Sequence, residues 1–183
     1  MNRLNVIFTL CAAYGIVFLQ TSVNWPRALL GAQPDLLPSL VVYAALTSGL
    51  GLSTTISICG GLWMDSLSRN PLGISILPLF LAGVIIERYR GLILRDQTYA
   101  QFVIGACASA AAPVITLILI LNTSLEPMVG WTSLWQWGVM ALAGGFMTPA
   151  WFWLFAWLLR GFSYETIQDP TGHSNRQIKR GRS

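Results

Sequence analysis

The feature that most constrains this chain is a stretch from residue 36 to residue 64 that carries no charged side chain. A helix needs about 20 apolar residues to cross a bilayer, so this stretch allows one strongly tilted crossing or two short ones. Further apolar runs occupy residues 4–23, 71–87, 100–122 and 133–159. The pattern predicts an all-α polytopic membrane protein with one transmembrane domain, over residues 1–162.

The composition leads to the same prediction. Of the 183 residues, 54% are hydrophobic and 10% are charged, whereas soluble domains carry about 25% charged residues. The net charge of +4 does not indicate nucleic acid, because the basic residues flank the apolar runs, where membrane orientation explains them. The bilayer is therefore the expected partner of most of this surface.

The number of spans follows from the basic residues, which favour the cytoplasmic side. Two crossings at about 36–50 and 53–67, joined at Gly49-Leu50-Gly51, would give six spans with both termini in the cytoplasm. The third span would then be short, tilted or partly broken. Five spans remain the alternative, with a single helix across the charge-free stretch. Residues 163–183 are polar and basic and are expected to form a flexible cytoplasmic tail.

The stretch from residue 60 to residue 73 interrupts the apolar sequence with an acid and a guanidinium. Asp65 and Arg69 are four residues apart and would share one face of a helix. Two interpretations remain open: an interfacial ion pair that closes the third span, or a polar cluster that shapes a turn for partner contact. Pro71 is expected in the first turn of the fourth span. Asp35 is suited to the N-terminus of the second span.

Small residues gather in the fifth span. Such residues at spacings of three to four let helices approach closely, so they predict a packing face towards this chain or a partner. The residues of that face are Gly105, Ala106, Ser109, Ala110 and Pro113.

The familiar catalytic motifs are missing from the sequence. It contains no Walker sequence, no Gly-x-Ser-x-Gly, no His-Glu-x-x-His and no Cys-x-x-Cys. The cysteines at positions 11, 59 and 107 fall inside apolar runs and match no metal spacing. We therefore expect no enzyme, no cofactor and no metal. A site built on Asp35 and Asp65 is the one enzymatic alternative.

The stretch around Asp65 resembles the bacterial rod shape-determining protein MreD family. Gly61, Asp65, Leu72 and Gly73 stand at that family's relative spacing, and Pro34-Asp35 before an apolar run is similar to the start of its second span. The resemblance covers roughly residues 4–160. The polar tail after residue 165 departs from the compact members of the family.

This resemblance implies a location and a role. The role is a non-enzymatic scaffold or adaptor of the cell-wall elongation complex, which maintains rod shape and makes side-wall peptidoglycan at the bacterial cytoplasmic (inner) membrane. The implied partners are an MreC-like protein, the actin-like MreB, RodA and a class B penicillin-binding transpeptidase. The family's membrane domain is thought to look like the substrate-binding subunit of energy-coupling-factor transporters.

That last similarity supports a second hypothesis, a membrane subunit that binds a small solute. The turn over residues 65–70 would then cover a pocket, with Trp131 and Trp135 nearby. Tight solute binding would distinguish this hypothesis from the scaffold, and a requirement for both Asp35 and Asp65 would distinguish the enzyme.

Overall fold

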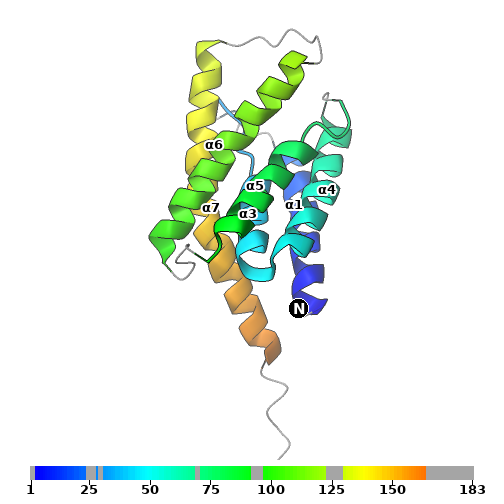
Figure 1. The fold of residues 1–183 in the computed structure, drawn as a ribbon, viewed down its shortest axis with the longest axis vertical. Helices are drawn as coiled ribbons and strands as arrows, with labels where there is room; N and C mark the ends of the chain where they lie inside the picture. The colour runs from blue at the N-terminus through cyan, green and yellow to red at the C-terminus, as the bar shows by residue number, and fades with distance from the viewer. Residues whose placement is uncertain are drawn as a thin grey trace, which may run out of the picture.

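The computed structural model describes residues 3–23, 28, 31–68, 71–91, 97–122 and 130–163. Within these residues the protein consists of six α-helices and contains no strand. The helices, labelled as in Figure 1, are α1 (Arg3–Ser22), α3 (Leu37–Ser48), α4 (Leu50–Leu67), α5 (Ile76–Tyr89), α6 (Thr98–Asn122) and α7 (Trp131–Ser163). Each described helix runs roughly opposite to the one before it, and the N-terminus lies towards the end of the bundle where α7 ends (Figure 1). The all-helical prediction is confirmed for this part of the chain.

Helix α3 forms the centre of the bundle. All of its residues from Leu37 to Leu46 are buried, and it contacts α1, α4, α5, α6 and α7. A helix that is apolar on every side is stable only when other helices surround it. Its 12 residues extend about 18 Å, which is less than the thickness of the hydrocarbon core. The protein itself, rather than lipid, therefore covers this helix.

The helix limits differ from the expected ones in the charge-free stretch. A single residue, Gly49, separates α3 from α4, and its φ of +83° is a left-handed conformation that favours glycine. Helix α4 then continues unbroken from Leu50 to Leu67, so the third expected span is not broken. The short helix is the second one, α3.

The start of the fourth expected span is also later than predicted. Helix α5 begins at Ile76 rather than at Pro71, because residues 72–75 form a turn. Pro71 precedes that turn, and its carbonyl accepts a hydrogen bond from the Ile74 amide at 3.3 Å. Pro78 lies in the first turn of α5, where a missing N–H costs no helical hydrogen bond, so no kink is required there.

Three helices are long and apolar enough to cross a membrane. Their crossing segments are Asn5–Ser22, Thr98–Asn122 and Ser133–Arg160. Only 22% to 28% of the residues in the hydropathy windows are buried inside the protein, so most residues of these segments keep exposed or partly exposed side chains. Exposed apolar surface on this scale is stable in lipid or against another protein, not in water. The chain is therefore a membrane protein. The tail from residue 164 lies outside the described residues.

A long-range hydrogen bond ties α7 to the central helix. The indole Nε1 of Trp151 donates to the Ser39 hydroxyl at 3.0 Å, and Ser39 is fully buried. The Ser39 hydroxyl in turn donates to the Leu36 carbonyl at 2.6 Å. A polar pair inside an apolar bundle specifies how the two helices meet.

We expect Trp151→Phe to lower the free energy of unfolding by about 1 kcal/mol, because the Ser39 hydroxyl loses its donor. Trp153→Phe is the matched control, since that side chain is 71% exposed on the same helix and should change stability little. Unfolding of both variants in the same detergent measures the difference. Equal stabilities would show that the hydrogen bond contributes nothing.

Candidate functional site

Asp65 is a buried carboxylate near the C-terminal end of α4. Its side chain is 1% exposed. Oδ2 accepts hydrogen bonds from the backbone N–H of Gly73 at 2.8 Å and of Ser75 at 3.1 Å, and Oδ1 accepts one from the Ser75 hydroxyl. Backbone N–H groups at the start of a helix lack partners within it and attract negative charge. Asp65 therefore holds the turn that leads into α5.

Two glycines allow this arrangement. Gly73 has a φ of +92°, which a side chain would strain. Gly61 faces the first residue of α5, and a Cβ added there would lie 2.9 Å from Ile76 Cγ1 and 3.0 Å from the Ile76 backbone nitrogen. We call Gly61, Asp65, Gly73 and Ser75 the α4–α5 joint. Gly61, Asp65 and Gly73, three of the residues on which the family resemblance rests, thus belong to the same joint.

Arg69 and Pro71 were also predicted to belong to this region. Arg69 lies outside the described residues, so the expected ion pair with Asp65 stays a prediction. The partners that the structure does show for Asp65 are Gly73 and Ser75, which lie across the turn rather than on the same helix face. Pro71 is exposed beside this turn.

Asp35 lies just before α3, as predicted, and its carboxylate accepts a hydrogen bond from the first residue of that helix. Oδ1 accepts hydrogen bonds from the Leu37 N–H at 3.0 Å and from Gln20 Nε2 at 3.4 Å. Gln20 Nε2 also donates to the Pro34 carbonyl at 3.2 Å, and the Gln33 side chain donates to the Gln20 carbonyl. The end of α1 and the start of α3 are therefore held together by polar side chains.

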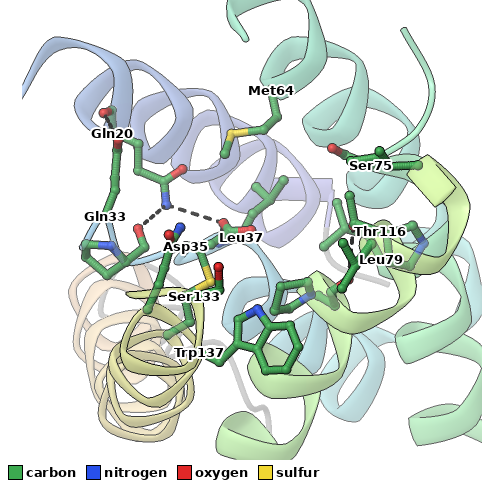
Figure 2. Close-up of a pocket in the computed structure, with 18 residues that line it drawn as sticks. Gln20, Gln33, Asp35, Leu37, Met64, Ser75, Leu79, Thr116, Ser133 and Trp137 are labelled. Atoms are coloured by element: carbon green, nitrogen blue, oxygen red, sulfur yellow. Dashed lines mark hydrogen bonds between the residues drawn. The ribbon is translucent and has the colours of Figure 1, made fainter. Parts of the chain in front are cut away.

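A pocket of about 450 Å³ opens beside Asp35 (Figure 2). Residues of α1, α3, α4, α5, α6 and α7 and of the segments before α3 and α5 line it. Its polar lining consists of Gln20, Gln33, Asp35, Ser75, Thr116, Ser133 and Gln136, and its apolar lining includes Leu37, Met64, Leu79, Leu117, Ile120, Trp137 and Met140. Volumes of 300–1,000 Å³ with a few polar groups among apolar ones are typical of small-molecule sites.

Asp35 is the titratable group among the residues that line this pocket, and Asp65 is not part of the lining. Burial raises the pKa of Asp35 above its ordinary value, while the hydrogen bonds from Leu37 and Gln20 lower it by less. Asp35 is half-buried at the wall of the pocket.

The raised pKa predicts a pH dependence of stability. At a pH between the ordinary pKa of Asp35, about 3.9, and its higher pKa in the folded protein, the unfolded chain has lost the Asp35 proton that the folded protein keeps. The contribution of Asp35 to the free energy of unfolding should therefore decrease as the pH rises through that window. Asp35→Asn keeps the acceptor for Leu37 and should flatten the profile within that window. Parallel profiles for the variant and the wild type, measured by unfolding in detergent, would contradict the prediction.

The residues predicted to form a packing face on the fifth span lie in different environments. Gly105 and Ser109 are buried against α7, where a Cβ on Gly105 would lie 2.6 Å from the Gly144 carbonyl oxygen. Pro113 lines the pocket. Ala106 and Ala110 are half-buried, while Ala108 and Ala112, two further small residues of the same span, are buried.

Sequence reasoning missed most of the pocket. It placed Trp131 and Trp135 near a possible site, but Trp137 lines the pocket and Trp135 is exposed. The side chain of Trp131 lies outside the described residues. A sequence feature that could have indicated this pocket is Gln20, a polar residue at the end of an apolar span.

Comparisons of this chain with family models, with curated proteins and with solved structures found no significant match.

Proposed function

We propose that the protein is a non-enzymatic membrane scaffold of the cell-wall elongation complex, which maintains rod shape and side-wall peptidoglycan synthesis. The observation that supports this proposal is the α4–α5 joint. Gly61, Asp65 and Gly73, which carry the resemblance to the MreD family, share one structural task there, and Asp65 uses its carboxylate to hold backbone. A carboxylate whose oxygens accept hydrogen bonds from the backbone of a turn fits a structural role in a scaffold better than a role in catalysis.

The outward faces of the long helices offer the surface that a scaffold needs. Large apolar side chains are exposed on α1 and α7, among them Tyr14, Phe18, Phe146, Trp153 and Trp157. The proposed partners are an MreC-like protein, the actin-like MreB, RodA and a class B penicillin-binding transpeptidase. These partners come from the resemblance, and the exposed faces are compatible with either lipid or protein contact.

The proposal includes six crossings of the bacterial cytoplasmic membrane with both termini inside. The alternating helix directions in Figure 1 support an even number of crossings, and the buried helix α3 would cross inside the bundle rather than against lipid. Labelling of single cysteines, introduced near residues 2 and 175 in cells, tests this topology. Protection of both positions from an impermeant reagent is the expected result, and labelling of one of them would leave five crossings.

The experiment that tests the scaffold function is depletion of the protein from the host cell, together with affinity purification from mild detergent. Depleted rods should become round, and both the wild-type chain and the exposed-site variant Ser66→Ala should restore them. An MreC-like protein and the wall synthases should co-purify. Depleted cells that stay rod-shaped would contradict the proposal.

The pocket favours a second candidate function, a membrane subunit that binds a small solute. Its volume of about 450 Å³ and its mixed polar and apolar lining support this reading. A subunit of an energy-coupling-factor-type transporter should co-purify with paired ATPase subunits. Saturable binding of a solute by the purified protein tests the pocket itself, whichever assembly contains it.

A further inference from the structure

The polar side of the pocket presents one carboxylate, Asp35, among amide and hydroxyl side chains. None of the described residues that line the pocket is a lysine, arginine or histidine. Both hydrogen bonds that described residues make to Asp35 end on Oδ1, which leaves Oδ2 able to accept from another donor. A carboxylate with no cation among the described lining residues gains most from a positively charged partner.

The side chain of Gln20 adds a second acceptor beside Asp35. Its Nε2 faces two acceptors, the Pro34 carbonyl and Asp35 Oδ1, so the positions of its oxygen and nitrogen are determined by their partners. The remaining atom, Oε1, is buried and accepts no hydrogen bond from the described residues, and the residue is 8% exposed. A buried acceptor without a donor costs about 1–3 kcal/mol, which a ligand with an N–H group can relieve.

The apolar side of the pocket suits a compact apolar or aromatic body. Figure 2 shows Trp137 and Leu79 across the pocket from Asp35 and Gln20. An indole ring also attracts a cation through its π-face. The two sides together select a molecule with one cationic donor end and one apolar end.

We propose that this pocket binds a small molecule with a primary ammonium group on a compact apolar body. The ammonium donates to Asp35, with the Gln20 oxygen as a second acceptor beside it, and the apolar body packs against Trp137 and Leu79. This inference rests on the solute-binding function and deepens it by naming the ligand class. We expect the pocket to disfavour anions, because Asp35 would repel them and none of the described lining residues is a compensating cation.

Calorimetric titration of the full chain in nanodiscs at pH 7 tests the proposal with three probes of similar shape. The probes are 2-phenylethylamine, 2-phenylethanol and 3-phenylpropionate. We expect saturable binding of the amine at least tenfold tighter than that of the alcohol, and no binding of the carboxylate. Repeating the amine titration in nanodiscs with phosphatidylethanolamine separates two sources, since competition there identifies a lipid amine as the occupant and its absence identifies a free solute.

Variants assign the binding to this pocket. Asp35→Asn should weaken amine binding at least tenfold and leave the weak binding of the alcohol unchanged. Thr116→Phe should abolish binding of both by filling the pocket from α6, which keeps the test decisive if Asp35→Asn folds poorly. Trp153→Ala, at an exposed position, is the control. Equal affinities for amine and alcohol would overturn the ligand class alone, whereas binding of none of the three probes would overturn the solute-binding function as well.

Discussion

Asp65→Ala should destabilise the protein by about 3 kcal/mol, one of the two largest effects that we expect from a single substitution. The variant leaves the N–H groups of Gly73 and Ser75 without their acceptor in a buried turn. Asp65→Asn should cost less, because one oxygen remains to accept while the amide group faces donors. The unfolding free energy of each variant in detergent, compared with the wild type, measures the effect.

The matched control is Ser66→Ala, at the neighbouring exposed position on α4. It removes a hydrogen bond from the Ser66 hydroxyl to the Trp63 carbonyl at the surface and should change stability by less than about 0.5 kcal/mol. If Asp65→Ala were as mild as Ser66→Ala, the α4–α5 joint would not depend on the carboxylate. The family resemblance at Asp65 would then need a functional rather than a structural explanation.

Gly105→Ala should destabilise the contact between α6 and α7 by about 2 kcal/mol. The added Cβ would lie 2.0 Å from Thr148 Oγ1 and 2.6 Å from the Gly144 carbonyl oxygen. The hydroxyl can rotate, but the carbonyl belongs to a helix backbone, so the two helices must separate and lose packing. The higher helix propensity of alanine, worth about 1 kcal/mol, offsets only part of this loss.

Gly138→Ala supplies the control for this substitution. Gly138 lies on α7, and a Cβ there would meet nothing within 4 Å. That variant should be as stable as the wild type or slightly more stable, because it gains helix propensity without a clash. Thermal unfolding of the two variants in the same detergent decides the matter, and equal loss in both would mean that α6 and α7 do not pack through Gly105.

The candidate site shows where sequence reasoning succeeded and where it stopped. Spacing on a single helix identified Gly105 and Ser109 as a packing face, and the position of Asp35 before an apolar run identified a helix start. The same reasoning paired Asp65 with Arg69, four residues away. Arg69 lies outside the described residues, so that pair stays a prediction. The contact that the reasoning missed is the one between Asp65 and Ser75, ten residues on, which forms because the chain turns back between α4 and α5. The spacing of residues along a helix indicates which of them share a face, but it does not identify the element that packs against that face.

By itself, the sequence determined that this is a helical membrane protein, because long stretches without charge can bury their backbone only as helices in lipid or in a protein interior. It also marked Gly61, Asp65 and Gly73 as unusual residues at the end of such a stretch. Only the tertiary structure decided that α3 is the central helix and that Gln20, Asp35 and Trp137 line one pocket. These residues are far apart in the chain, and their proximity depends on how the helices pack, which is a property of all their surfaces together.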